Sequence, residues 1–230
     1  MRKLIDDIVG LFFPDCCLGC DRPLVKGEEL ICVYCRFGIP KTAFHLQSFH
    51  EGVQLVGGHF PLEFVLAYLY FDGESRVQQM IHRLKYFRQP ALAYQLGVEY
   101  GKILVECNHP VTAVDALIPV PMTSAKQRKR GYNQSEVFAQ GLSSVLAIPV
   151  LNKVLRRKEN SQSQVGKGRR ARFQNLAAAI ELGDPGELAG KHVLLVDDVL
   201  TSGATVVACA KPLVIAAVDR ISVVAIARKR

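Results

Sequence analysis

Acidic residues are scarce in this sequence of 230 residues, in which 21 Asp and Glu stand against 29 Lys and Arg and the formal net charge is +8. That balance favours an anionic partner, such as nucleic acid, a phosphate compound or an acidic surface. No internal repeat and no low-complexity segment is present, which excludes repeat architectures. With 49% hydrophobic residues, the chain is expected to be neither disordered nor fibrous.

The sequence also lacks a recognisable membrane span and secretory leader. The longest nearly uncharged stretch, residues 199–218, contains Lys211 and Pro212 and opens on a Thr-Ser-Gly turn, which predicts a buried turn and helix instead. Near the amino terminus, Asp6 and Asp7 interrupt the apolar run, and no small-residue cleavage site follows. We therefore expect a cytoplasmic protein.

Seven cysteines are present, an odd number, and four of them form two Cys-x-x-Cys pairs. Without an export signal, this pattern favours a reducing compartment and a metal over disulfides. Two knuckles that each supply two thiolates suit a closed, structural zinc site. We predict zinc on Cys17, Cys20, Cys32 and Cys35, with Cys16 as a competing candidate. The alternatives are four unrelated buried cysteines, or a redox pair, for which the thioredoxin-like strand–helix context is missing.

Hydrophobic periodicity and capping residues predict the local structure. Ser75 with Gln78, and Asn133 with Glu136, form capping boxes at the starts of two helices. Pro212 is expected to bend or shorten the last helix. The predicted helices are residues 4–13, 76–87, 91–106, 134–146 and 204–217, and the predicted strands are residues 64–71, 114–120, 193–196 and 221–227.

From residue 114 onward, short apolar strands alternate with helices. This alternation predicts an α/β fold with a mostly parallel sheet and helices on its faces.

The most informative segment is residues 192–205, HVLLVDDVLTSGAT. Two carboxylates follow an apolar strand, and a turn of small residues then leads into a helix. Ligands of open parallel sheets bind at that end of the strands. Asp197 and Asp198 suit ribose hydroxyls and Mg²⁺. The turn suits a phosphate group, because its amides and hydroxyls face an anion at a helix N-terminus. The residues of this cradle are Thr201, Ser202, Gly203, Ala204 and Thr205.

Other proteins share part of this segment. A Walker B strand also ends in carboxylates, but no G-x-x-x-x-G-K-[ST] loop exists in the chain, which argues against a P-loop NTPase. Response-regulator receivers carry a similar acidic pair, but too few residues follow Asp198 to build such a domain. A solvated acidic strand end with a plain turn is the remaining alternative.

Basic residues gather in two further segments, 126–130 and 156–172. The longer segment looks like a mobile loop, able to close over a phosphate ligand or to follow a nucleic-acid backbone. A solvated charged loop is the alternative for both segments. On the helix predicted at 76–87, Lys85 and Tyr86 add a cation and a stacking face. The candidate nucleic-acid-binding residues are Lys85, Tyr86, Arg156, Arg157, Lys167, Arg169, Arg170 and Arg172.

Taken together, these segments resemble the ComF family, which is also described as amidophosphoribosyltransferase-like. The resemblance covers nearly the whole chain and is carried by the two cysteine pairs, residues 81–86, residues 119–122, Arg128 with residues 130–134, Gln164 with Arg172 and Asn175, and residues 193–205.

The resemblance implies a type I phosphoribosyltransferase-like domain over residues 51–230, preceded by an amphipathic helix and a zinc-ribbon module over residues 1–50. It also implies binding of 5-phosphoribosyl-1-pyrophosphate (PRPP) with Mg²⁺. The family's role implies handling of single-stranded DNA during natural competence, with other competence proteins as partners.

The same resemblance places the pyrophosphate loop after Pro121, where Arg128 and Arg130 are expected to bind phosphate oxygens. Transfer from PRPP passes through an oxocarbenium-like ribose, so Asp197 and Asp198 are the candidate catalytic residues.

Three functions fit these observations. The first is a PRPP-binding protein that handles single-stranded DNA, with transfer weak, absent or directed to an unknown acceptor. The second is a metabolic phosphoribosyltransferase that acts on a small nucleophile. The third is a non-catalytic zinc-ribbon adaptor with a vestigial PRPP site. The basic loop at residues 156–172 favours the first.

Overall fold

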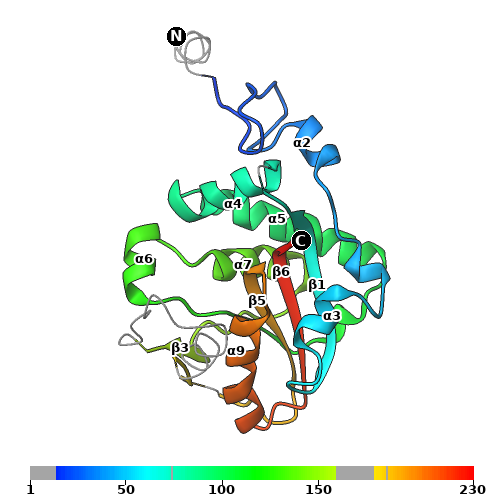
Figure 1. The fold of residues 1–230 in the computed structure, drawn as a ribbon, viewed down its shortest axis with the longest axis vertical. Coiled ribbons are helices and arrows are strands. Elements are labelled where there is room, and N and C mark those ends of the chain that lie inside the picture. The colour runs from blue at the N-terminus through cyan, green and yellow to red at the C-terminus, as the bar shows by residue number, and fades with distance from the viewer. Residues whose placement is uncertain (1–13, 74, 159–178, 185) are drawn as a thin grey trace.

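The computed structural model of the protein describes residues 14–73, 75–158, 179–184 and 186–230 (Figure 1). Several predictions lie outside these residues: the helix at 4–13, most of the loop at 156–172, and the candidate contacts of Lys167, Arg169, Arg170 and Arg172.

A four-stranded sheet forms the centre of the molecule, with the strand order β1-β6-β5-β2 (Figure 1). Each neighbouring pair of strands is parallel, which confirms the predicted parallel sheet. The strands are β1 (Leu62–Phe71), β2 (Ala116–Pro119), β5 (His192–Leu200) and β6 (Arg220–Lys229).

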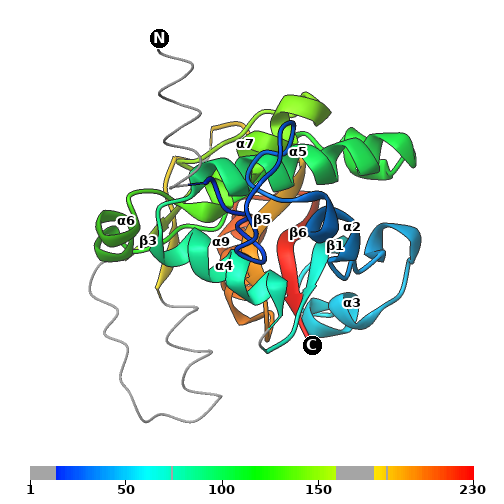
Figure 2. The ribbon, with the colours of Figure 1, turned by 90° about the horizontal axis from the view of Figure 1, so that it is seen from above.

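Helices cover both faces of this sheet (Figures 1 and 2). Alternate residues of β5 enter two separate hydrophobic cores: Leu194 and Val196 face one, and Val193 and Leu195 face the other. The first core is completed by α4 (Arg76–Tyr86), α5 (Pro90–Glu106) and α7 (Gln134–Leu146), and the second by α3 (Glu51–Val56) and α9 (Ala204–Ile215).

The predicted caps fix two helix starts. Ser75 Oγ accepts a hydrogen bond from Gln78 N at 3.2 Å, and Asn133 Oδ1 accepts one from Ser135 N at 3.2 Å. The second capping box is incomplete, however, because the Glu136 carboxylate accepts from Asn152 instead. Pro212 lies inside α9, which continues past it to Ile215, two residues short of the predicted end.

Two predicted boundaries are wrong. Arg156 and Arg157 belong to strand β3 (Leu155–Arg157), which pairs with β4 (Ile180–Leu182), rather than to a loop. The partner strand lies far along the chain, so no local pattern reveals the pairing. Asp197 and Asp198 lie within β5 rather than after it, since that strand continues to Leu200.

Short helices occupy segments without a clear sequence period. In the described part of the chain they are α2 (Val33–Gly38), α6 (Ser124–Arg130), two 3-10 helices, η1 (Phe44–Leu46) and η2 (Pro110–Ala113), and α3, whose bounds are given above. Among the described residues, no helix combines the length and apolar character needed to cross a bilayer.

The chain that leaves the cysteine-rich segment lies along the outer edge of β1. Tyr70 N donates to Pro40 O at 2.8 Å, and Thr42 N donates to Tyr68 O at 3.1 Å. The edge strand of the sheet is therefore covered by residues from the amino-terminal side of residue 50, and the predicted domain division at that residue stays a prediction.

Candidate functional site

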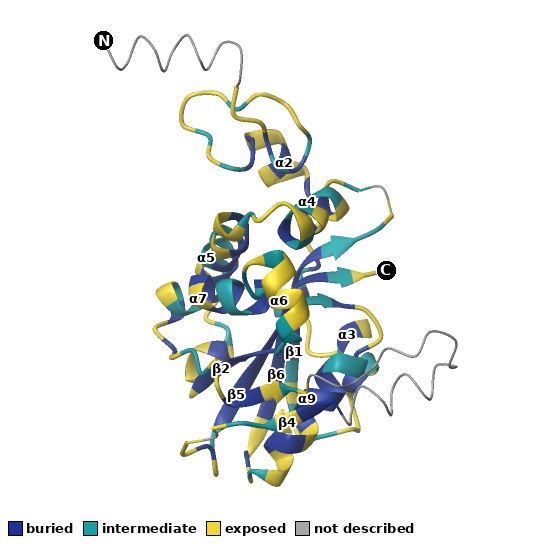
Figure 3. Cartoon of the chain, turned by 90° about the vertical axis from the view of Figure 1, so that its left-hand side faces the viewer, coloured by how far each residue is buried: buried dark blue, intermediate teal, exposed yellow. Residues whose placement is uncertain are grey.

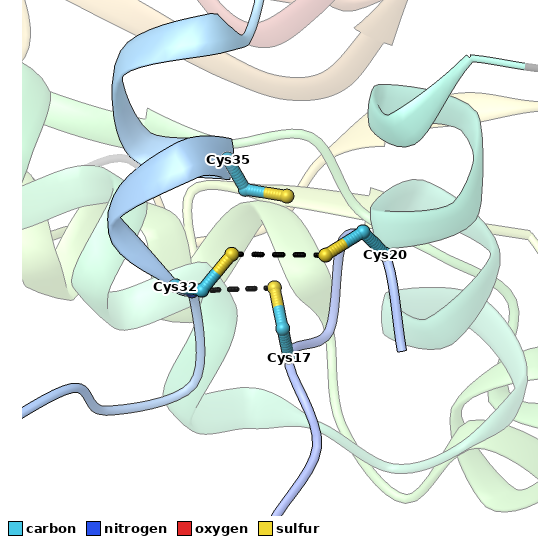
Figure 4. A group of neighbouring side chains, drawn as sticks. All are labelled: Cys17, Cys20, Cys32 and Cys35. Atoms are coloured by element: carbon cyan, nitrogen blue, oxygen red, sulfur yellow. Dashed lines mark hydrogen bonds between the residues drawn. The ribbon is translucent and has the colours of Figure 1, made fainter. Parts of the chain in front are cut away.

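The four predicted ligand cysteines converge on one point (Figure 4). Their sulfur atoms all lie within 4.8 Å of one another, and Cys20 Sγ is 3.6 Å from Cys32 Sγ. A tetrahedral zinc with bonds of about 2.3 Å needs sulfurs about 3.8 Å apart, so the cluster fits that ion. Cys16 is not part of this group: its exposed thiol donates to Pro14 O instead.

Local backbone geometry shapes the cluster. The amides of Cys32 and Gly19 donate hydrogen bonds to Cys17 Sγ. Burial opposes ionisation of this thiol, but the hydrogen bonds from the two amides and from the thiols of Cys32 and Cys35 together lower the pKa of Cys17 to about 7. Position 19 is limited to glycine by its surroundings, because a Cβ there would lie only 2.9 Å from Cys35 Sγ. Glycine therefore allows the two knuckles to close on each other.

The cysteine-rich segment is attached to α4 (Figures 1 and 2). Arg83 on that helix donates to Cys17 O at 2.9 Å and forms an ion pair with Asp21. Gln79, one turn earlier, donates to the same Asp21 carboxylate. Met80 is fully buried in the core that also contains Cys17. The position of α4 therefore depends on the cysteine cluster.

A second group of predicted residues lines a pocket at the carboxyl ends of β2 and β5. Asp197 and Asp198 contribute from β5, and the side wall is formed by the end of α4, by α6, by β3 and by the starts of α7 and α9. The wall residues include Lys85, Pro121, Lys126, Arg130, Arg157 and Thr205.

Asp197 and Asp198 differ in burial and in their hydrogen-bond and ion-pair partners. Asp197 is buried, and its Oδ1 accepts a hydrogen bond from Asp198 N at 2.8 Å. Burial, and then the charge of Asp198, raise the pKa of Asp197 to about 7. Asp198 is half-buried and forms an ion pair with Lys85, with 3.1 Å between Oδ2 and Nζ. One carboxyl therefore holds its proton far more strongly than an ordinary aspartate.

The raised pKa of Asp197 makes a testable prediction about stability. Its ordinary value is 3.8, so the folded protein binds more protons than the unfolded chain between about pH 4 and pH 7. The stability of the wild type should fall as pH rises through that window. In Asp197→Asn this contribution should be absent, and urea denaturation should show a difference between the two proteins that changes by about 2–4 kcal/mol from pH 4 to pH 8. Equal pH profiles for the two proteins would contradict the assignment.

The predicted phosphate cradle forms the turn between β5 and α9. Gly203 has φ +72°, and a Cβ at this position would lie 2.6 Å from Val56 Cγ1 and 3.1 Å from Leu55 O of α3. Glycine therefore suits this turn on both counts. The N-cap residue is Gly203 itself, which has no side chain to cap the helix, so within the described residues the first amides of α9 are available to an anion. Thr205 lines the pocket, whereas Thr201 and Ser202 are exposed outside its lining.

Cations surround the two aspartates. Arg130, a predicted phosphate contact, lines the pocket and donates to Gln134 Oε1 at 2.9 Å. Lys126 and Arg157 also line the pocket. Lys126 was not among the predicted site residues, and Arg157 was predicted to contact nucleic acid. Partial desolvation, and then Arg157 and Arg130, lower the pKa of Lys126. Within the described part of the chain, the buried Arg157 Nε has no hydrogen-bond partner. These crowded cations favour an anionic ligand.

Other predicted residues lie outside this pocket. Arg128 is exposed on α6, which is drawn mostly in the colour of exposed residues in Figure 3, and it is not part of the lining. Tyr86, at the end of α4, is 57% exposed, and its ring lies 4.8 Å from that of His82. Arg156 lines an adjoining cavity with Arg157.

The segment Tyr132–Gln134 holds the pocket together. Tyr132 Oη and Gln134 Nε2 both donate to Leu84 O, at 2.7 and 2.9 Å. Asn133 Nδ2 donates to Val120 O at 3.0 Å. These bonds join the end of α4 and the end of β2 to the start of α7. The sequence gives no local signal for them, because the acceptors lie far away along the chain.

A family model matches the carboxyl-terminal part of the chain. The sequence model of the protein family described as "Phosphoribosyl transferase domain" matches residues 133–230. This range includes α7, β5, α9, β6 and the two aspartates. The chain has a type I phosphoribosyltransferase-like fold, with an amino-terminal four-cysteine cluster consistent with a zinc ribbon. A purine phosphoribosyltransferase from Pyrococcus horikoshii Ot3 is similar at 18% identity, over 59% of this chain and 81% of that one, with a TM-score of 0.35.

Two relatives match almost the full length. Competence protein F of Haemophilus influenzae is 33% identical over 220 residues, which cover 92% of this chain and 90% of the relative. DNA utilization protein YhgH of Escherichia coli (strain K12) is 28% identical over 213 residues, covering 85% of this chain and 89% of the relative. The chain belongs to the family of competence protein F, the ComF family.

Proposed function

We propose that the pocket binds PRPP together with Mg²⁺. The observation that carries this proposal is the convergence of two carboxylates, several cations and an uncapped helix N-terminus on one pocket. The start of α9 and Thr205 suit the 5-phosphate, and Asp197 and Asp198 suit the ribose hydroxyls. Arg130, Lys126 and Arg157 would bind the pyrophosphate, the leaving group of a transfer reaction.

Magnesium would be held through Asp198 and the diphosphate. Carboxylate and phosphate oxygens are the ligands that this ion prefers. Mg²⁺ would neutralise charge on the leaving pyrophosphate. The half-buried Asp198 is the better ligand of the pair, since the neighbouring Asp197 binds a proton more strongly.

The cysteine cluster is proposed to hold zinc in a purely structural role. All four ligand positions come from the protein, which leaves no open position for substrate. The cluster supports α4, and that helix carries Lys85 into the pocket. Zinc would therefore stabilise the wall of the PRPP site without taking part in chemistry.

We further propose that the protein binds single-stranded DNA in a competence or DNA-utilization role, in the cytoplasm. The names of the two full-length relatives and the charge of +8 support this proposal. Tyr86 and Phe87 directly follow Lys85 at the end of α4, are 57% and 61% exposed, and offer stacking faces to bases. Exposed basic residues of α6 offer contacts to phosphates.

Two titrations test these proposals. PRPP with Mg²⁺ should raise the melting temperature, and a fluorescent oligo-dT should bind with an affinity that falls steeply with salt. Absence of both effects would contradict the proposed function. A change in oligo-dT affinity on adding PRPP would show that the two ligands are coupled.

Tyr86→Ala should weaken binding of oligo-dT by about 5- to 150-fold, because one stacked base is worth about 1–3 kcal/mol. Tyr94→Ala provides the control, since Tyr94 is also exposed, at 42%, but on α5. Fluorescence anisotropy at about 0.1 M salt measures both variants. Equal losses in the two variants would argue against a specific stacking role for Tyr86.

A second candidate function is transfer to a small nucleophile. A cavity of about 510 Å³ adjoins the pocket and shares Pro121, Asn133 and Arg157 with it. This volume lies within the range of small-molecule sites, about 300–1,000 Å³, so an acceptor has room beside the donor. Release of pyrophosphate from PRPP that depends on an added amine or base, without any oligo-dT binding, would favour this function.

A further inference from the structure

Among the described residues, Lys85 differs from the other cations of the pocket because it forms an ion pair with a carboxylate. Its ammonium group lies 3.1 Å from Asp198 Oδ2, and the side chains of Lys85 and Asp198 are 25% and 21% exposed. Partial burial strengthens such a pair relative to a surface salt bridge. The proposed Mg²⁺ ligand is therefore already paired with a cation from α4.

The backbone on the amino-terminal side of Lys85 is held in place. Arg83 is attached to Cys17 O and Asp21. The next residue, Leu84, is buried, and its carbonyl accepts hydrogen bonds from both Tyr132 and Gln134. Because α4 is fixed at these two residues, the helix has little freedom to move away. The four-carbon side chain of Lys85 can still rotate, so its ammonium group is the part that can change partner.

A diphosphate ligand would change the charges around this lysine. Lys126, Arg130 and Arg157 line the same pocket without neutralising Asp198 in an ion pair. A polyanion among these cations attracts the Lys85 ammonium, while a divalent cation attracts the Asp198 carboxylate more strongly than a monovalent one does. Together, these two changes would replace the ion pair between Lys85 and Asp198 with two pairs, one between Lys85 and the diphosphate and one between Asp198 and the divalent cation.

We infer that Lys85 is an exchangeable counter-ion of the pocket, which pairs with Asp198 until a diphosphate ligand binds and then pairs with the diphosphate, leaving Asp198 to the accompanying divalent cation. This inference rests on the proposed function and assigns Lys85 to the PRPP pocket rather than to nucleic acid. Free Mg²⁺ must then compete with Lys85 for Asp198, whereas diphosphate and Mg²⁺ assist each other's binding.

The test measures the binding of the cation and of the diphosphate separately. The full chain is titrated calorimetrically with Mg²⁺ alone and with inorganic pyrophosphate alone. Lys85→Met should weaken pyrophosphate binding by about 10- to 100-fold, the effect of losing one charge-assisted contact. The same variant should bind Mg²⁺ alone several-fold more tightly than the wild type. Opposite changes of these two affinities are not produced by a general structural defect.

Two further variants complete the experiment. Lys102→Met removes one exposed positive charge from α5 and should leave both affinities unchanged. Lys85→Arg keeps the charge and should retain most of the pyrophosphate binding, even if Lys85→Met folds poorly. Unchanged or equally reduced affinities in Lys85→Met, or loss of pyrophosphate binding in Lys85→Arg, would overturn the inference while PRPP binding by the wild type still supports the proposed function. If the wild type binds neither PRPP nor pyrophosphate, the proposed function itself fails.

Discussion

Replacing Cys35 with serine is expected to abolish zinc binding and to destabilise the protein strongly. Cys35 is completely buried, and its sulfur is one of four that converge within 4.8 Å. A serine hydroxyl is a poor substitute for a thiolate ligand, and metal-binding free energy in such modules is folding free energy. We expect zinc content to fall from about one ion per chain to nearly none. A loss of about 3 kcal/mol would lower the melting temperature by about 10 °C.

Cys16→Ser is the matched control for this prediction. Cys16 is adjacent to the ligand Cys17, but its thiol is exposed and directed to Pro14 O. Zinc content and melting temperature should therefore stay at the wild-type values. Elemental analysis and a thermal melt measure both variants. If Cys16→Ser lost the metal and Cys35→Ser kept it, the ligand set derived from the structure would be incorrect.

Asp198→Asn is expected to lose most of the affinity for PRPP with Mg²⁺. The substitution removes the carboxylate that faces Lys85 and the proposed metal, but keeps the size of the side chain. Loss of a charged contact worth about 1.5–3 kcal/mol corresponds to about 10- to 150-fold weaker binding. The thermal shift at a fixed, subsaturating PRPP concentration should fall accordingly.

The control for Asp198→Asn is Asp219→Asn, which removes a 59% exposed aspartate paired with Arg220. This variant should bind PRPP as the wild type does. Full PRPP affinity in Asp198→Asn, measured in the presence of Mg²⁺, would remove Asp198 from the site. Equal losses in both variants would point instead to a general effect of charge.

Local sequence signals predicted the strands of the sheet and the longer helices that cover it, but not the short helix α3. Ser75 and Asn133 mark the helix starts observed at α4 and α7, because a cap depends on residues only a few positions away. Likewise, the run at 193–196 marks a strand buried on both faces. The convergence of the four cysteines was also predictable, since tetrahedral coordination leaves few spacings for its ligands.

Long-range pairing was not predictable from one sequence. Lys85 reaches Asp198 across 113 positions of the chain, and Tyr132 reaches Leu84 across 48. Nothing near Lys85 distinguishes a pocket residue from an exposed helical lysine. The strand containing Arg157 was missed for the same reason, since its partner begins only at Ile180. Residue types predicted the kind of pocket, and tertiary contacts decide which cations belong to it.

The cover on β1 by Pro40 and Thr42 limits how the chain can be divided for study. A fragment that begins after residue 42 would retain every strand of the sheet and all residues that line the pocket. It would also present the bare peptide groups of Tyr68 and Tyr70 to solvent, and an unprotected strand edge recruits other copies into continuous sheets. Recombinant fragments of the transferase-like part should therefore start before Pro40, or aggregation will obscure any ligand measurement.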